Sequence, residues 1–330
     1  MKRRLWLIAL MGIYSVAAGS TVGQQSSPVR QFKASGQHAS FEWFFLPVEM
    51  GEARGLWAGN GLDPEFVPAA ASAVQLKQQI EAGVKIGLVN TAEVLLARSQ
   101  GAPVRIVAGY FGATIAKIFV RADAPMKTAQ DLDGKKIGIL SETHTSARAV
   151  LYMNQQLGIK AEPVALGNLA NNTAALRAGT VDAFYSSEGA ALALVDSGEL
   201  KILVPLADVY PRPYTAAVIW ATDDLIERHP DLVKSFVKTI LESVRALKEH
   251  PDQAIGLFIK QTNAPQSLAA RAVAELNNFL TSGGRGSGQD LVAAVAGNWQ
   301  FTKDSGAIPA GTNVNINEAV DAEFLPEQGF

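Results

Sequence analysis

The sequence has 330 residues, of which 48% are hydrophobic and 18% charged, with a formal net charge of −2 and a pI near 6.1. This length allows one large or two medium domains, and the absence of a Lys/Arg run after residue 4 argues against a nucleic-acid partner. Zero cysteines exclude a disulfide framework, a thiolate metal site and a cysteine nucleophile, so the stability of the chain must come from its apolar core.

The first 23 residues have the pattern of a secretory leader. Residues 1–4 (MKRR) are basic, residues 5–16 form an apolar run, and residues 17–20 (AAGS) are small, as a cleavage site requires. The apolar run is short for a membrane span, and an uncleaved anchor is the alternative. We expect a cleaved signal peptide over residues 1–23 and a periplasmic location, which suits an exported chain without disulfides.

Strand-like and helical segments alternate from residue 29 to residue 112. Ser72 and Gln75 have the spacing of a capping box, and Gly83 and Gly101 are typical helix stops. This alternation is typical of crossover units and predicts an α/β fold with mostly parallel sheets. The predicted strands are residues 31–36, 64–69, 84–89 and 104–110, and the predicted helices are residues 72–83 and 90–101.

The same alternation restarts at residue 117. A further strand over residues 214–222 precedes a mostly helical tail. We therefore predict a discontinuous lobe 1 (residues 29–113 and 214–330), a lobe 2 inserted between them (residues 114–213), and a hinge made of two chain crossings. The predicted strands of the insert are residues 117–122, 135–140, 161–166, 181–186 and 200–206, with helices at residues 145–158, 171–179 and 188–198.

The clearest helix of the tail is predicted over residues 230–250. Pro230 lies near its start and Pro251 just beyond its end, where proline is tolerated. Residues 281–289 are rich in glycine and serine and predict a surface loop. The apolar side chains that share one face of this helix are Leu232, Val233, Phe236, Val237, Ile240, Leu241, Val244 and Leu247.

Several stretches resemble the SsuA/THI5-like solute-binding proteins of bacterial ABC importers, of the alkanesulfonate, taurine, nitrate and thiamine-precursor type. The resemblance implies a type II periplasmic-binding-protein fold, in which two lobes joined by a two-crossing hinge close around a ligand. Two departures concern ligand identity: Gly83-Val84-Lys85 replaces an acidic residue common in relatives, and residues 141–144 (SETH) replace a glycine-serine turn. The similar stretches are residues 46–67, 80–110, 128–140, 166–203, 223–254 and 301–325.

Candidate ligand-binding residues follow from the rule that ligands bind beyond the carboxyl ends of parallel strands. After the first strand, Phe41, Trp43 and Phe44 could wall a cleft, or instead belong to the core of the lobe. Asn90 and Thr91 follow the third strand, where Thr91 also suits the N-cap of the next helix. Tyr110 ends the fourth strand and could both stack on a ligand and donate a hydrogen bond to it.

The turn before the predicted helix at residue 145 holds the strongest candidates. Thr143, Thr145 and Ser146 supply three hydroxyl groups, more than one helix cap needs. The unpaired N–H groups and positive end of the helix dipole favour an anion or polar ring edge there. The alternative is capping plus solvent. His144 is a candidate hydrogen-bonding wall residue, although a lone histidine is more often without such a role.

Lobe 2 adds Asn168, Ser186 and Glu188 at strand-to-helix turns, and Tyr214 stands at the return crossing. Arg212 is the only arginine that we expect near the cleft. Few cations and many aromatic, hydroxyl and amide groups favour a neutral or singly charged organic solute. Too few metal ligands can be assembled for a metal site, and the sequence indicates no cofactor and no catalytic constellation.

Three functions remain open. The first is a monomeric extracytoplasmic receptor that delivers a sulfonate, pyrimidine or aromatic/heterocyclic solute to an inner-membrane ABC permease. The second is an enzyme on the same scaffold, as in thiamine-precursor synthesis, although no nucleophile elbow or phosphate loop is present. The third is an input subunit of a membrane sensor kinase, which would use the same pocket.

Overall fold

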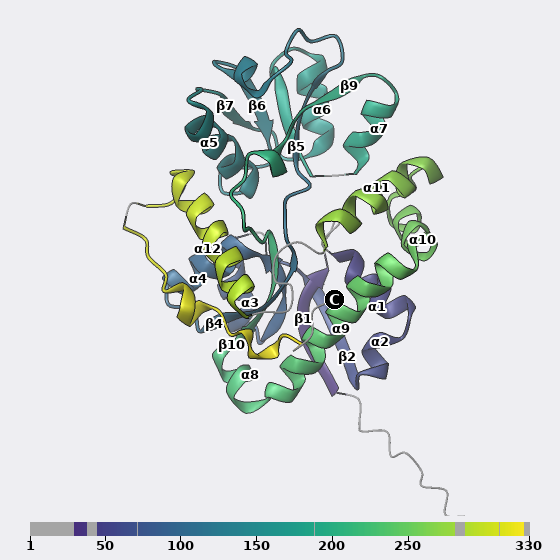
Figure 1. Ribbon diagram of the computed structural model, residues 1–330, viewed down its shortest axis with the longest axis vertical. Helices are drawn as coiled ribbons and strands as arrows, with labels where there is room; N and C mark the ends of the chain where they lie inside the picture. The colour runs from purple at the N-terminus through teal and green to yellow at the C-terminus, as the bar shows by residue number, and fades with distance from the viewer. Residues whose placement is uncertain are drawn as a thin grey trace, which may run out of the picture.

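The chain forms two five-stranded sheets, which lie one above the other in Figure 1. The computed structural model describes residues 30–37, 45–70, 72–187, 189–280, 288–309 and 311–326. The first sheet has the strand order β2-β1-β3-β10-β4 and the second the order β7-β6-β8-β5-β9. We call the part of the molecule built on the first sheet lobe 1 and the part built on the second lobe 2. The predicted two-lobed α/β fold with mostly parallel sheets is confirmed.

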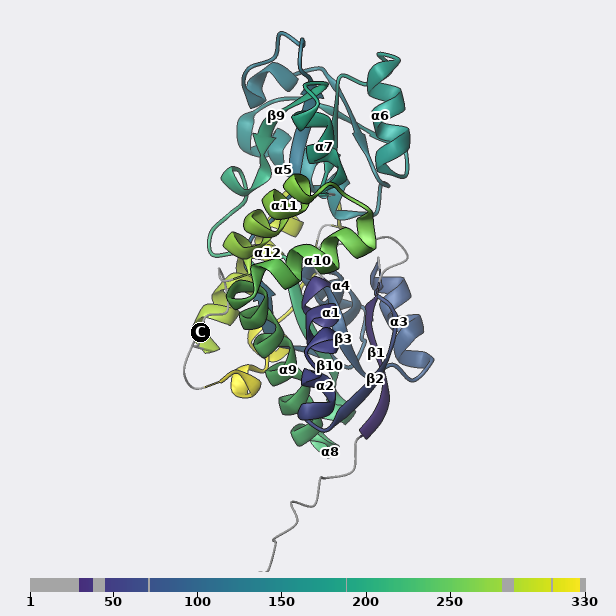
Figure 2. The ribbon, with the colours of Figure 1, turned by 90° about the vertical axis from the view of Figure 1, so that its right-hand side faces the viewer.

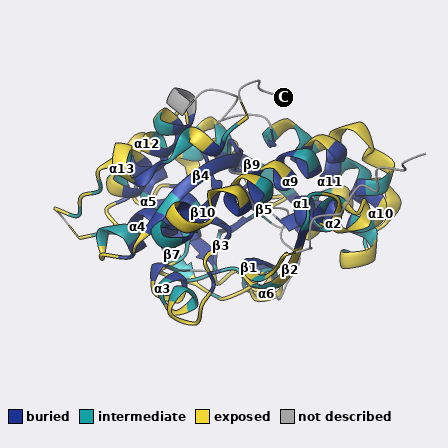
Figure 3. Cartoon of the chain, turned by 90° about the horizontal axis from the view of Figure 1, so that it is seen from below, coloured by how far each residue is buried: buried dark blue, intermediate teal, exposed yellow. Residues whose placement is uncertain are grey.

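Three strands of the lobe 1 sheet, β3, β4 and β10, are buried on both faces, which explains why their sequences are nearly continuously apolar. Along β10, Val218 and Trp220 pack on one face, while Ile219 and Ala221 pack on the other. Figure 3 shows the central strands buried, with the exposed surface on the outer sides of the helices. The strands are β1 (Arg30–Gln37), β2 (Leu62–Pro68), β3 (Ile86–Asn90), β4 (Val104–Phe111) and β10 (Ala217–Thr222).

Helices α1 (Leu46–Ala53), α2 (Leu56–Gly59) and α9 (Pro230–Glu249) cover one face of this sheet. Helices α3 (Ala73–Glu81), α4 (Thr91–Ser99) and α12 (Gly288–Asp304) cover the other. All eight apolar residues predicted for one face of α9 are buried, and Ser72 caps α3 as predicted. The remaining elements are α8 (Asp223–Arg228), α10 (Pro251–Thr262), α11 (Gln266–Phe279), α13 (Ile316–Ala319) and η4 (Ala322–Phe324).

Lobe 2 is smaller and has the same layered plan. Helix α5 (Thr145–Leu157) ends as predicted at Gly158, whose φ of 66° lies in the left-handed region that favours glycine. The strands are β5 (Lys117–Arg121), β6 (Lys136–Ile139), β7 (Glu162–Ala165), β8 (Ala183–Ser186) and β9 (Leu200–Pro205). The other helical segments are η2 (Ala129–Leu132), α6 (Leu169–Arg177), α7 (Ala190–Asp196) and η3 (Leu206–Asp208).

Each sheet contains one antiparallel strand, and in both sheets it is the first strand after a crossing. Strand β5 runs antiparallel to β8 and β9, and β10 runs antiparallel to β3 and β4. The chain leaves β4 and β9 at their carboxyl ends and enters the next sheet from the edge that faces the other lobe. The carboxyl ends of the parallel strands therefore face one another across the space between the lobes, where ligands of such sheets bind.

Helix α11 belongs to the helical tail but contacts lobe 2. Arg271 pairs with Asp196 of α7, and Lys117 of β5 lies 2.9 Å from Glu275. Figure 2 shows α11 directly below lobe 2, with α10 below it. These ion pairs join the lobes on the side of α11.

The leader and residues 281–287 of the loop predicted over residues 281–289 lie outside the described residues, whereas residues 288–289 belong to α12 and not to a loop. Among the helices of the described ranges, none combines the length and the apolar character that a membrane crossing requires.

We call the segment that leads from β9 back to β10, residues 206–216, the return crossing. It packs tightly against α12, and this contact is a test of the fold. A Cβ atom on Gly297 would lie 1.9 Å from the carbonyl oxygen of Pro213, so any side chain forces the helix and the crossing apart. We predict that Gly297→Ala lowers the free energy of unfolding by about 1–3 kcal/mol. Urea unfolding followed by circular dichroism measures the change.

Gly256 is the matched control, because it lies exposed in α10 and an added Cβ meets nothing within 4 Å. Gly256→Ala should raise the free energy of unfolding by about 0.5–1 kcal/mol, as expected for glycine in a helix interior. Equal effects of the two substitutions would contradict the tight packing of α12 on the crossing.

Candidate ligand-binding site

A narrow cavity of about 30 Å³ lies between the two lobes. Its lining comes from strand ends of both sheets, from the return crossing and from α12. A second hollow of about 360 Å³ is lined by the two crossings and the end of α11, and it shares Thr114 and Tyr214 with the first. The described residues that line the first cavity are Asn90, Ala92, Thr114, His144, Thr145, Arg148, Tyr185, Ser187, Tyr214, Ala216, Asn298 and Phe301.

The positions of the lining residues follow from the sheet topology. Asn90 ends β3 and Ser187 follows β8, so both stand at carboxyl ends of parallel strands. Ala216 directly precedes β10, whose antiparallel direction brings its amino end to the same edge. The cavity therefore lies where the chain connections of the two sheets meet.

The turn after β6 is organised by a histidine. His144, not a threonine or serine, is the N-cap of α5: its Nδ1 accepts a hydrogen bond from the backbone N–H of Ser146, 3.0 Å away. A nitrogen that accepts carries no proton, so this geometry assigns the proton of the neutral ring to Nε2. The ring also meets Tyr185 edge-on at 6.4 Å. We expected one of the three hydroxyls to cap this helix, but the cap is the imidazole nitrogen of His144, which reaches the first turn instead.

The hydroxyl of Ser146 holds the turn together. It accepts a hydrogen bond from the N–H of Leu140 and lies 3.1 Å from His144 Nδ1, and the residue is fully buried. A serine beside a histidine suggests a nucleophile and its base, but this hydroxyl has no exposure to a substrate. The pair therefore fixes the shape of the turn.

A buried ion pair crosses the space between the lobes. Arg148 Nη2 of α5 lies 2.6 Å from Glu93 Oε1 of α4, and the two side chains are 4% and 3% exposed. The same guanidinium donates to the hydroxyl of Thr145 and the carbonyl of Thr143. Because the contact joins a lobe 1 helix to a lobe 2 helix, the structure shows the lobes closed on each other.

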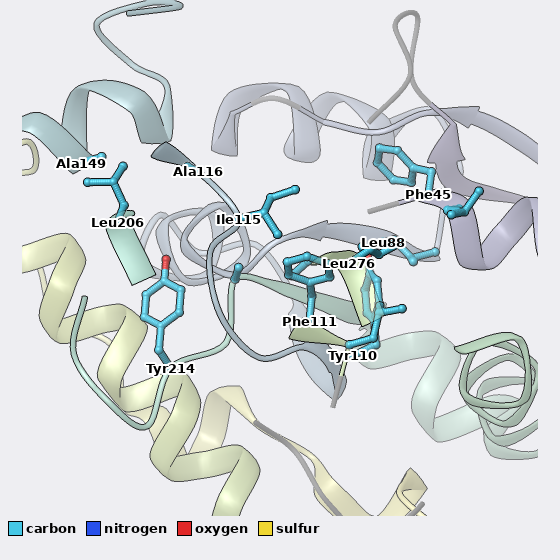
Figure 4. Packing of buried hydrophobic residues seen from close by; sticks show 14 of the residues in the cluster. Phe45, Leu88, Tyr110, Phe111, Ile115, Ala116, Ala149, Leu206, Tyr214 and Leu276 are labelled. Carbon is cyan, nitrogen blue, oxygen red and sulfur yellow. The ribbon is translucent and has the colours of Figure 1, made fainter. Parts of the chain in front are cut away.

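Aromatic rings from three parts of the chain meet beside the cavity. Phe301 of α12 contacts Tyr210 at 4.4 Å and Tyr152 of α5 at 4.8 Å between ring centroids. Tyr214 meets both Tyr210 and Phe301 edge-on. Figure 4 shows Tyr214 pointing from the return crossing toward Leu206. These rings provide a large, rigid apolar wall at low entropic cost.

The return crossing is anchored at Thr215. Its carbonyl oxygen accepts hydrogen bonds from Thr91 Oγ1 and Asn298 Nδ2, both at 2.8 Å, and its own hydroxyl donates to the carbonyl of Phe111 at 3.1 Å. Thr91 and Thr215 are fully buried. The hydroxyl of Thr91 thus fastens the crossing, and the N-cap of α4 is Asn90, contrary to our prediction for Thr91.

The structure brings together four of the predicted site residues: Asn90, His144, Thr145 and Tyr214 line the cavity. Thr91 and Ser146 are buried beside it with their hydroxyls bonded within the protein, and Tyr110 packs in the lobe 1 core, as Figure 4 shows.

The other predicted site residues lie away from the cavity or outside the described residues. Thr143 is exposed and Ser186 is buried, and neither is among the lining residues. Asn168 is exposed and caps α6 through a hydrogen bond from the N–H of Asn171. Phe41, Trp43, Phe44 and Glu188 lie outside the described residues.

Sequence reasoning missed the arginine that matters most. Arg148, not Arg212, lines the cavity between the lobes. The sequence did contain one pattern that could have revealed Arg148. It is a single charged residue in the first turns of a predicted helix, four positions after His144 and thus on the same face of that helix. Asn298 and Phe301 gave no local signal, because α12 reaches the cavity only through the packing of the helical tail. Groups of three or more metal-ligating side chains are absent from the described ranges.

The family profile described as NMT1/THI5 like matches residues 44–254, more than half of the chain. The chain belongs to the NMT1/THI5-like family. The "Riboflavin-binding protein RibY" of Chloroflexus aurantiacus is 26% identical over 238 residues, which cover 66% of this chain and 62% of that protein. The "Taurine-binding periplasmic protein" of Escherichia coli is 27% identical over 253 residues, covering 74% of this chain and 72% of that protein. The chain thus spans less than two thirds of the riboflavin-binding relative.

Several solved structures share the fold. The alkanesulfonate-binding protein SsuA from Xanthomonas axonopodis pv. citri bound to MOPS has a TM-score of 0.71 at 16% identity, covering 90% of this chain and 99% of that one. The desulfurization enzyme DSZB has a TM-score of 0.62 at 16% identity, covering 89% and 97%. Because the same fold carries binding proteins and an enzyme, function must be argued from the site.

The buried tyrosines give this NMT1/THI5-like protein a predictable response to alkaline pH. Burial raises the pKa of Tyr210 well above its ordinary value of 10 and raises the pKa of Tyr214 as well. The unfolded chain ionises these hydroxyls near pH 10 while the folded chain keeps them protonated, so the unfolded state then binds fewer protons. We predict a free energy of unfolding that is unaffected by these groups below about pH 10 and falls as the pH rises above it.

The Tyr210→Phe variant separates the contribution of tyrosine ionisation from other effects of alkaline pH on the free energy of unfolding. The Tyr210 hydroxyl is buried and has no hydrogen-bond partner among the described residues, so its removal should raise the free energy of unfolding by about 1 kcal/mol at pH 7. The variant should also show a shallower loss of stability above pH 10. Urea unfolding from pH 7 to pH 11 measures both effects. Destabilisation at pH 7 would show that the hydroxyl makes a stabilising contact.

Proposed function

We propose that this protein is an extracytoplasmic solute-binding receptor that captures a small organic molecule between its lobes and delivers it to an ABC-type importer. The observation that carries the proposal is one cavity lined by residues of both lobes, at the carboxyl edges of both sheets. A ligand that contacts both sides favours the closed arrangement over the open one. A riboflavin-binding protein and a taurine-binding protein among the relatives support binding as the function of the family.

We infer that the protein binds its ligand without converting it. The serine and histidine nearest to a catalytic pair are Ser146 and His144, and the serine hydroxyl is buried and bonded to the backbone of Leu140. His144 Nδ1 is used as the cap of α5, which fixes the ring in place. A nucleophile must reach the reacting atom, and Ser146 does not.

The lining supports a ligand with a flat apolar part and several hydrogen-bonding atoms. Tyr185, Tyr214 and Phe301 supply rings, while Asn90 and Ser187 supply an amide and a hydroxyl. The Asn90 side chain makes no capping hydrogen bond, which leaves its donor and acceptor for a ligand. This lining fits an aromatic or heterocyclic solute better than a small dianion, and it keeps pyrimidines and aryl sulfonates among the candidates.

We further propose a periplasmic location, reached through cleavage of residues 1–23, and an inner-membrane permease as partner. The basic, apolar and small segments of the leader support export. The periplasmic taurine-binding relative of Escherichia coli agrees with this proposal.

Thermal-shift and calorimetric screening of the chain from residue 24 tests the proposed function. The panel contains aliphatic and aryl sulfonates, pyrimidines, flavins and aromatic acids. At least one compound should raise the melting temperature, because a ligand that binds only the folded state stabilises it. A panel without any stabilising compound would contradict the receptor function.

Substitutions of lining residues test whether the compound binds in the cavity. Asn90→Ala and Tyr214→Phe each remove a polar group from the lining, and each should weaken binding about tenfold, as the loss of one buried hydrogen bond does. Asn168→Ala is the matched control, because this exposed asparagine only caps α6. It should lower the free energy of unfolding by about 1 kcal/mol and leave the dissociation constant unchanged. Equal dissociation constants in the wild-type protein and the three variants would show that the ligand binds outside this cavity.

A further inference from the structure

The ion pair between the lobes decides what charge the cavity presents to a ligand. Glu93 belongs to α4 and Arg148 to α5, and their 2.6 Å contact is buried from solvent on both sides. Arg148 also lines the cavity. A buried carboxylate at this distance cancels most of the field of the guanidinium.

Three of the five N–H donors of Arg148 have partners within the protein. Nη1 donates to the carbonyl of Thr143, and Nη2 donates to Glu93 and to the hydroxyl of Thr145. Nε is buried and has no partner among the described residues. A buried N–H without an acceptor is costly, so a ligand that placed an acceptor at Nε would remove that cost.

The rest of the described lining carries no formal charge. It consists of apolar, aromatic, hydroxyl and amide side chains together with His144, whose Nδ1 accepts a hydrogen bond. An anion that enters this closed cavity loses its hydration and finds a cation already paired with Glu93. A neutral acceptor, such as a carbonyl oxygen or a ring nitrogen, loses less hydration and gains the hydrogen bond from Nε.

We propose that Glu93 is a specificity-determining residue: by neutralising Arg148 it makes the cavity select uncharged ligands that present an acceptor to Arg148 Nε. This inference rests on the proposed receptor function and names the charge class of its ligand. Glu93 acts through Arg148, so its role is to set the field at the ligand. The same contact also joins α4 to α5, which means that closure of the lobes creates the neutral site.

Isosteric probes that differ in charge test this inference. The pairs are benzamide and benzoate, nicotinamide and nicotinate, and benzenesulfonamide and benzenesulfonate, with dissociation constants from ligand-observed NMR and calorimetry at fixed salt. The wild-type protein should bind the neutral member of each pair at least about tenfold more tightly, a difference that one buried unpaired charge readily produces. Tighter binding of the anions by the wild-type protein would overturn the inference without any variant.

Glu93→Gln keeps an oxygen that accepts from Arg148 Nη2 but removes the negative charge. It should reverse the preference and tighten anion binding at least about tenfold. The double variant E93Q/R148Q is neutral again and should return the preference to the neutral probes. Thr145→Val is the control, because it removes a hydrogen bond to Arg148 without changing charge, so the preference should keep its direction.

The outcomes separate this inference from the proposed function. If Glu93→Gln leaves the ratio of affinities unchanged, the ion pair only holds the lobes together and the inference fails. If compounds of the wider panel bind in the cavity and all are anions, the receptor function stands and the inference fails. If no probe and no panel compound binds, both fail.

Discussion

The carbonyl oxygen of Thr215 fixes the position of the return crossing, and the rest of the site depends on that position. It accepts two side-chain hydrogen bonds, from Thr91 of α4 and Asn298 of α12, in a fully buried setting. A buried carbonyl must be satisfied, so the crossing cannot leave this place without losing both bonds. Gly297 allows the helix to approach the crossing closely enough for them to form.

The fixed crossing determines the direction of β10 and hence the layout of the cavity. The chain enters each sheet from the edge that faces the other lobe, so β5 and β10 run opposite to their neighbours. The carboxyl ends of the parallel strands are left facing one another, with Tyr214 and Ala216 of the crossing between them. Closing the lobes then brings α4 and α5 together, and Glu93 meets Arg148.

Membership of the NMT1/THI5-like family and the shared fold leave the chemistry of the ligand open. Binding proteins and a desulfurization enzyme have this architecture, so the arrangement of layers does not select a reaction or a solute. The selection lies in a few side chains at the strand ends. Here those side chains include His144, which caps α5, and Arg148, whose charge is neutralised by Glu93. A cluster of aromatic rings from α5, the return crossing and α12 completes the set.

The sequence by itself determined the two sheets, the order of their elements and the two crossings. Local periodicity, caps and stops carry that information: the apolar stripe of α9, the Ser72 cap and the Gly158 stop all appear where the pattern predicted them. It also located the strand ends, and with them Asn90, His144, Thr145 and Tyr214 in the cavity wall.

Only the tertiary structure decided which polar groups serve the fold and which face the cavity. Thr91 and Ser146 look like ligand-binding residues in sequence, yet their hydroxyls bond to Thr215 and Leu140. Arg148 pairs with Glu93 of another helix and lines the cavity together with Phe301 of a third, and no local pattern predicts either arrangement. Hydrogen-bond partners and side-chain contacts across lobes arise from packing between segments far apart in the chain, whereas helices and strands follow from neighbouring residues.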